Sequence, residues 1–169
     1  MRWASVENEM NTKRLTPRFM AEAGIIAALY FALTMAIAPL SFGQLQMRVS
    51  EALCVLPFFT PAAIPGLFIG CLLANIFSFL GIFDVLFGSF ATLAAAALTY
   101  FIKNKWLLPL PSVAVNAFVI GALLYYLAEL PFWISALYVG AGQAIACYAL
   151  GMPLFFVLNK HKAKLFGRA

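Results

Sequence analysis

The sequence has little charge: Asp, Glu, Lys and Arg make up 10% of its 169 residues, whereas 64% are apolar. An ordinary soluble domain carries about 25% charged residues, and so few charges could not cover this much apolar surface. A disulfide-stabilised secreted scaffold, a disordered tail and a nucleic-acid-binding protein are therefore excluded. The composition predicts an integral membrane protein whose spanning elements are helices.

Cysteine and histidine are also scarce. Cys54, Cys71 and Cys147 lie far apart in apolar runs and form no CxxC pair, so we interpret them as small buried residues. The one histidine, His161, lies in a basic tail. The sequence holds no GxxxxGK[ST] loop, HExxH pair or GxSxG elbow. It therefore predicts no enzyme activity, no metal site and no cofactor.

Long apolar runs, uncharged except for Glu22 near the start of the first, predict six membrane spans, since a span needs about 20 apolar residues. The predicted spans are 19–40, two short spans within 52–83 divided by the TPAAIPG turn at 60–66, then 85–102, 113–128 and 130–159. A cleavable signal peptide is not expected, because the first run is too long and no A-x-A site follows it. We expect an N-terminal cytoplasmic segment at 1–17, a six-helix membrane domain at 18–159 and a basic cytoplasmic tail at 160–169.

The basic residues predict the orientation. With six spans, all of the 11 Lys and Arg residues except Arg48 fall on one face. Because loops rich in Lys and Arg stay in the cytoplasm, both termini are predicted to be cytoplasmic. The chain is expected to be a multi-pass protein of the cell membrane.

Ionisable and polar side chains in or beside the spans are candidates for a functional site, because they are costly in a membrane. Arg48, Glu51, Asp84 and Glu129 lie at span ends on the predicted outer face, where they could line one cavity. Carboxylates there would suit a ligand with N–H donors or a positive amine. Further candidates for ligand contact are the amides Asn75, Asn116 and Gln143 and the aromatic residues Trp133, Tyr126 and Tyr138.

Each of these candidates also has a plainer interpretation. Carboxylates at helix ends complement the helix dipole, amides join membrane helices, and Trp and Tyr are enriched at membrane interfaces. In the first span, Ala23, Ala27, Ala28 and Ala32 recur at a spacing of four. Such a stripe lets another helix approach closely, either within the bundle or in a separate membrane partner.

Three segments resemble the QueT family: QLQMRVSEALCVLPFFTPAAIPGLFIGCLLAN at 44–75, FDVLFGSFATLAAA at 83–96 and WISALYVGAGQAIACYALGMPL at 133–154. The resemblance covers residues 18–158. It implies an S-component, the substrate-binding subunit of an energy-coupling factor transporter, with six helices and both ends in the cytoplasm. The implied substrate is a queuosine precursor, which is a deazaguanine base. The implied partners are a transmembrane coupling protein and two ATPase subunits.

The resemblance also implies roles for the candidate residues. A deazaguanine presents a ring N–H beside an exocyclic amine, and a carboxylate accepts both as a pair; Glu51 is the first choice. The base carbonyl needs a donor, for which Arg48, Asn75 or Gln143 is available. Asp84 or Glu129 could pair with a cationic arm, and Trp133 or a tyrosine could stack on the ring.

S-components dock on the coupling protein through an alanine motif in their first span, which implies that role for Ala23, Ala27, Ala28 or Ala32. Two other interpretations stay open. One is an S-component for another small molecule, such as a vitamin. The other is a facilitator that transports without ATPase partners; a membrane enzyme is disfavoured because no acid–base or metal set is present.

Overall fold

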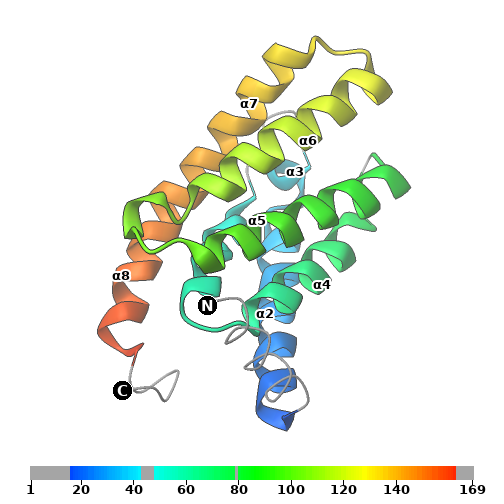
Figure 1. The fold of residues 1–169 in the computed structure, drawn as a ribbon. Helices are drawn as coiled ribbons and strands as arrows, with labels where there is room; N and C mark the ends of the chain where they lie inside the picture. Colours follow the sequence, from blue (N-terminus) through cyan, green and yellow to red (C-terminus); the bar gives the residue numbers. More distant parts are fainter. Residues whose placement is uncertain (1–15, 43–47, 79, 163–169) are drawn as a thin grey trace.

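A computed structural model describes residues 16–42, 48–78 and 80–162, and these fold into helices with no strand among them. Most of the predicted N-terminal segment and basic tail, and residues 43–47 of the predicted first outer loop, lie outside the described residues. The helices pack into one bundle (Figure 1). The start of α2 and the end of α8 lie at its lower end, and the connection from α6 to α7 lies at its upper end.

The helices follow one another with short connections. They are α2 (Pro17–Ala36), α3 (Ala38–Ser41), the 3₁₀ helix η1 (Val49–Phe58), α4 (Ala63–Asn75), the π-helical turn η2 (Asp84–Gly88), α5 (Ser89–Phe101), the 3₁₀ turn η3 (Lys105–Leu107), α6 (Leu110–Ala128), α7 (Phe132–Ala144), the π-helical segment η4 (Ile145–Gly151) and α8 (Met152–Lys160). Since η2 continues into α5, and α7 continues through η4 into α8, the described residues contain six hydrophobic helical stretches.

Four of these stretches are long and apolar enough to cross a membrane: Pro17–Ala36, Asp84–Phe101, Lys105–Ala128 and Phe132–Lys160. The other two, η1 and α4, have 10 and 13 residues. At about 2.0 and 1.5 Å per residue, each is roughly 20 Å long, shorter than the ~30 Å hydrocarbon core. The prediction of a helical membrane protein is confirmed. Six full spans and cytoplasmic termini remain predictions.

The predicted turn between the two short helices is displaced. The chain turns at residues 59–62, and α4 begins at Ala63. Pro65 and Gly66, which the sequence placed in the turn, therefore lie in the first turn of α4, where a proline is tolerated. In the same way α6 begins at Leu110 instead of residue 113, with Pro111 in its first turn.

The 3₁₀ helix η1 runs antiparallel to α2 through the middle of the bundle. Near the upper end, Thr34 Oγ1 and Ser50 Oγ lie 2.7 Å apart, within hydrogen-bond distance. Near the lower end, the Thr60 hydroxyl donates to the Glu22 carboxylate at 3.0 Å, just beyond the end of η1. Because η1 is almost wholly buried, its polar side chains are enclosed by the surrounding helices.

Glycines in α4 allow α2 to pack against it at close range. A Cβ atom on Gly66 would lie 2.8 Å from the Ala23 carbonyl oxygen. A Cβ atom on Gly70 would lie 2.8 Å from the Ala27 carbonyl oxygen and 2.7 Å from the Tyr30 Cβ. This is the close backbone contact that small residues permit between membrane helices.

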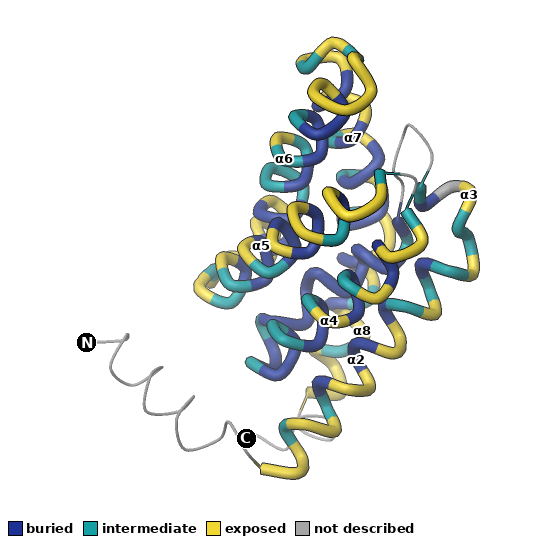
Figure 2. Tube along the Cα trace, turned by 90° about the vertical axis from the view of Figure 1, so that its right-hand side faces the viewer, coloured by how far each residue is buried: buried dark blue, intermediate teal, exposed yellow. Residues whose placement is uncertain are grey.

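The alanine stripe of α2 therefore divides between two faces. Ala23 and Ala27 are buried against α4, whereas Ala28 and Ala32 are exposed. Figure 2 shows this alternation as buried and exposed segments that follow one another along the tube of α2. Many other exposed side chains in the bundle are large and apolar, including Ile25, Leu29 and Phe118. Such a surface is suited to contact with lipid.

Candidate functional site

A buried ion pair lies where the end of α4, the start of η1 and the turn η2 meet. Arg48 Nη2 donates to Asp84 Oδ2 at 3.1 Å, and Arg48 Nη1 donates to Asn75 Oδ1 at 2.8 Å. Arg48 is 4% exposed, and Asp84 and Asn75 are 0% exposed. We call these three residues the arginine cluster. Three candidates chosen from the sequence are thus in direct contact.

The two acceptors of the arginine cluster are also joined to each other by a hydrogen bond between α4 and η2. Asn75 Nδ2 donates to the Asp84 carbonyl oxygen at 2.9 Å, so the Asn75 carbonyl oxygen faces the guanidinium. Gly88 leaves the space that these side chains fill, because a Cβ atom there would lie 2.5 Å from Asp84 Oδ1 and 2.9 Å from Asn75 Nδ2. By contrast, Arg48 Nε reaches the Ser41 carbonyl oxygen only at 3.4 Å.

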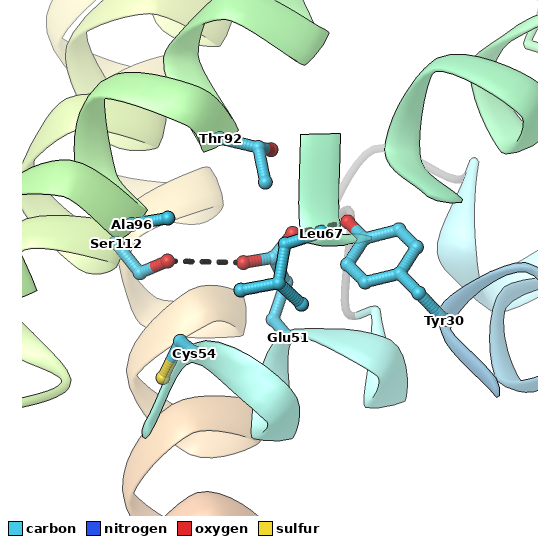
Figure 3. A pocket seen from close by; sticks show the side chains of 7 residues that line it. All are labelled: Tyr30, Glu51, Cys54, Leu67, Thr92, Ala96 and Ser112. Atoms are coloured by element: carbon cyan, nitrogen blue, oxygen red, sulfur yellow. Dashed lines mark hydrogen bonds between the residues drawn. The ribbon is translucent and has the colours of Figure 1, made fainter. Parts of the chain in front are cut away.

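A second buried group surrounds Glu51, which is 2% exposed. The Tyr30 hydroxyl donates to Glu51 Oε1, and the Ser112 hydroxyl donates to Glu51 Oε2 at 3.0 Å. Figure 3 shows Tyr30 and Ser112 approaching the carboxylate from opposite sides. The space that Glu51 shares with Cys54, Leu67, Thr92 and Ala96 is too small for a water molecule. We call Tyr30, Glu51 and Ser112 the glutamate cluster.

Cys71 and Thr92 join the two clusters. The Thr92 hydroxyl, which lines the space beside Glu51, donates to Cys71 Sγ at 3.2 Å. Asn75 Nδ2 lies 3.4 Å and Arg48 Nη1 lies 3.8 Å from the same sulfur. The clusters therefore form one continuous polar region inside an apolar bundle.

Two other amides predicted from the sequence are buried near this region. Asn116 lies one helical turn beyond Ser112 on α6 and is 3% exposed. Gln143 is equally buried, and its Oε1 accepts from the Cys147 thiol at 3.7 Å. That thiol also lies 3.5 Å from the Glu51 carbonyl oxygen.

Two buried polar atoms have no hydrogen-bond partner among the described residues: Asp84 Oδ1 and Asn116 Nδ2. One is an acceptor and the other is a donor. A buried polar group without a partner costs free energy, so such groups in a native protein point to a ligand or to water. Both atoms belong to side chains that the sequence marked as candidates for ligand contact.

The remaining four candidates lie on the surface of the bundle. Trp133 is 71%, Tyr126 78% and Tyr138 56% exposed. Tyr126 lines an apolar groove of about 530 Å³ with Phe83 and Phe118. Glu129 is exposed and adopts a left-handed φ of 53° where α6 ends. The structure does not bring these residues to the buried clusters.

Sequence reasoning missed Tyr30, Ser112, Thr92 and the role of Cys71. The only signal for the three hydroxyl residues is their presence in apolar runs. That signal is weak, because a Ser or Thr hydroxyl in a helix often bonds to its own backbone. Thr34 does so here, donating to the Tyr30 carbonyl oxygen at 2.9 Å. In the part of the chain that the structure describes, no three His, Cys, Asp or Glu side chains could hold a metal ion.

The apolar exterior, the membrane-length helices and the enclosed charged region define a multi-pass helical membrane protein with a buried polar site. Residues 20–160 match the QueT transporter family, and the chain belongs to that family. A curated relative is the queuosine precursor transporter QueT of Lactococcus lactis subsp. cremoris (strain MG1363). It is 37% identical over 84 residues, which are 48% of this chain and 49% of the relative. The match thus spans about half the length of the relative. No solved structure matches the chain.

Proposed function

We propose that the chain is the substrate-binding subunit of an energy-coupling factor importer and that it captures a queuosine precursor at the outer face of the membrane. Its membership of the QueT transporter family supports this function, as does the printed name of the relative from Lactococcus lactis. The observation that carries the proposal is the buried polar region, because ionisable groups inside a membrane bundle are expensive and are kept for function.

The donors and acceptors of this region suit a deazaguanine base. Its ring N–H and exocyclic amine need an acceptor, and Glu51 and Asp84 are the two buried carboxylates among the described residues. Its carbonyl oxygen needs a donor, which Asn116 Nδ2, Gln143 or Arg48 could supply. The proposed ligand contacts are these five residues and Asn75. Trp133, Tyr126, Tyr138 and Glu129 are exposed, so the proposal leaves them outside the contact set.

The proposal also includes a partner surface on α2. The chain has no P-loop of its own, so ATP-driven uptake requires a transmembrane coupling protein and two ATPase subunits. Ala28 and Ala32 form an exposed small-residue face on α2, while Ala23 and Ala27 are already used in packing against α4. A partner helix could approach the exposed face closely.

Binding and transport by the purified chain in lipid vesicles test the function. We expect saturable binding of 7-deazaguanine or its aminomethyl form, and no binding of thiamine or riboflavin. Replacement of the carboxylate that accepts from the base, in Glu51→Gln or Asp84→Asn, should weaken binding by about 10-fold or more, since a hydrogen bond to a charged group contributes about 1.5–3 kcal/mol. Uptake should require the coupling protein, both ATPases and ATP.

Two results would contradict the proposal. Tight binding of a vitamin without binding of a deazaguanine would indicate a different substrate class. Uptake of a deazaguanine by vesicles that contain this chain alone would indicate a facilitator. Leu29→Ala serves as a control, because this exposed side chain on α2 lies outside both clusters and should leave binding unchanged.

A further inference from the structure

The arginine cluster already holds a group with the donor pattern of the ligand. The Arg48 guanidinium offers two neighbouring nitrogens, one to Asn75 Oδ1 at 2.8 Å and the other to Asp84 Oδ2 at 3.1 Å. Both acceptors belong to fully buried side chains and bind the two terminal nitrogens of one guanidinium. The site is thus shaped to accept two parallel N–H groups attached to one carbon atom.

A deazaguanine carries the same fragment. Its ring N–H and its exocyclic amine are attached to one sp² carbon, as the two terminal nitrogens of a guanidinium are. Planar fragments of this kind favour paired acceptors. Asp84 and Asn75 could therefore bind the base through the contacts that they now make with Arg48.

The glutamate cluster is less available to such a ligand. Both Glu51 oxygens accept from hydroxyl groups on fixed helices, Tyr30 on α2 and Ser112 on α6. The space beside them does not admit a water molecule. A base bound to Glu51 would have to break both contacts, whereas a base bound to Asp84 and Asn75 would replace one side chain by equivalent donors.

The geometry points to Asp84 and Asn75 as the subsite that binds the ring N–H and exocyclic amine of the base. Without ligand, the Arg48 guanidinium occupies this subsite. This inference rests on the proposed function and changes the assignment within it, since the sequence made Glu51 the first choice. Ligand binding then requires Arg48 to move.

The charge of Asp84 limits how far Arg48 moves. A buried carboxylate left without a cation is costly, and the base edge is neutral. Asp84 has a second oxygen, Oδ1, that has no hydrogen-bond partner among the described residues. We expect the guanidinium to stay beside Asp84 while the base takes the contacts at Oδ2 and Asn75. Arg48 is therefore a positioning residue as well as a competitor.

A comparison of two ligands in three proteins tests the assignment. The ligands are 7-deazaguanine and its analogue without the exocyclic amine; the proteins are the wild type, Asp84→Asn and Glu51→Gln, purified in lipid nanodiscs. Loss of the amine should weaken wild-type binding about 10- to 100-fold, the usual range for a hydrogen bond to a charged group. The difference in affinity between the two ligands should shrink to about 3-fold or less in Asp84→Asn. In Glu51→Gln it should stay as large as in the wild type.

The opposite pattern would overturn the assignment and leave the proposed function intact. In that case the affinity difference between the two ligands would disappear in Glu51→Gln and remain in Asp84→Asn. An amine that contributes nothing in the wild type would overturn it as well. If the wild type binds neither ligand, the proposed function itself fails.

A second experiment covers the case in which Asp84→Asn does not fold. Millimolar guanidinium chloride should raise the thermal unfolding midpoint of Arg48→Ala saturably, because the ion fills the vacated subsite, and 7-deazaguanine should compete with it. The wild type should show no such rise. An equal response of both proteins to guanidinium, or the absence of competition, would refute the inference.

Discussion

At the scale of single residues, the Arg48–Asp84 ion pair is the contact that joins two opposite charges inside the buried region. Both side chains are enclosed, and their nitrogen and oxygen atoms lie 3.1 Å apart. The attraction between buried charges offsets much of their desolvation cost, but removal of one partner leaves an uncompensated charge. The sequence shows that these charges are costly. It does not show that they pair with each other.

Arg48→Met is expected to reduce the free energy of unfolding by about 3–5 kcal/mol, because Asp84 is left charged and buried. Adding Asp84→Asn to this variant should restore a large part of the loss. Unfolding in mixed detergent micelles, followed by tryptophan fluorescence, measures both effects.

The matched control is the partly exposed pair Arg18–Glu22, whose side chains are 66% and 30% exposed and whose nitrogen and oxygen atoms lie 3.0 Å apart. Arg18→Met should cost less than about 1 kcal/mol, as surface pairs do. Equal losses for Arg18→Met and Arg48→Met would show that burial of the second pair has no energetic consequence.

At the scale of elements, α2 packs one face against the bundle and exposes the other face. Its inner face carries Ala27 against Gly70 and Tyr30 against Glu51. Its outer face carries Ala28. The sequence shows alanines at a spacing of four, but this spacing occurs both on the buried face, with Ala23 and Ala27, and on the exposed face, with Ala28 and Ala32. Only the position of α4 distinguishes packing alanines from exposed ones.

The same substitution at two adjacent positions should separate folding from docking. Ala27→Leu is expected to destabilise the chain by about 1–3 kcal/mol, because the new atoms would overlap α4. Ala28→Leu should leave stability and ligand binding unchanged, but should prevent association with the coupling protein and abolish uptake. Unfolding in detergent and co-purification with the coupling protein measure these effects.

Loss of stability in Ala28→Leu would place that residue inside the bundle. Normal uptake by a stable Ala28→Leu protein would remove the outer face of α2 from the proposed partner surface. Either result would be independent of the ligand assignment.

At the scale of the whole molecule, the short helices η1 and α4 act as a pair. The chain runs down through η1 and returns through α4, and the turn at 59–62 lies beside Glu22 near the start of α2. Whether the pair crosses the bilayer completely or enters and returns, it brings the chain back to the same side. Both termini are therefore predicted to lie on the cytoplasmic side of the membrane, however deeply η1 and α4 enter the bilayer.

Single cysteines introduced on the surface test this topology. Lys103→Cys, between α5 and α6, should react with a membrane-impermeant maleimide only after the cells are opened. Glu129→Cys, between α6 and α7, should react in intact cells. Both positions are exposed, and the native cysteines are buried, so background labelling should be low.

Labelling of both positions from the same side would contradict an α6 that crosses the membrane. Exchange of the two patterns would place the termini outside the cell and would contradict the orientation predicted from the basic residues.

Hydropathy was enough to predict the membrane class, the helical content and the approximate ends of the four long apolar helices, because the thickness of the bilayer and the cost of exposing backbone groups to lipid act on each segment locally. It also marked Arg48, Glu51 and Asp84, since a charge in an apolar run is visible without a fold. The turn at 59–62 and the start of α6 were misplaced, because the sequence treated Pro65 and Pro111 as breaks although each is tolerated in a first helical turn.

The partners of those charges were decided by tertiary structure. The contacts of Arg48 with Asn75 and Asp84 span 27 and 36 residues, and the contact of Ser112 with Glu51 spans 61. No local pattern encodes such pairs, because helices that lie far apart in the chain bring them together. The same reason explains why Trp133 and Glu129, equally conspicuous in the sequence, remain at the surface.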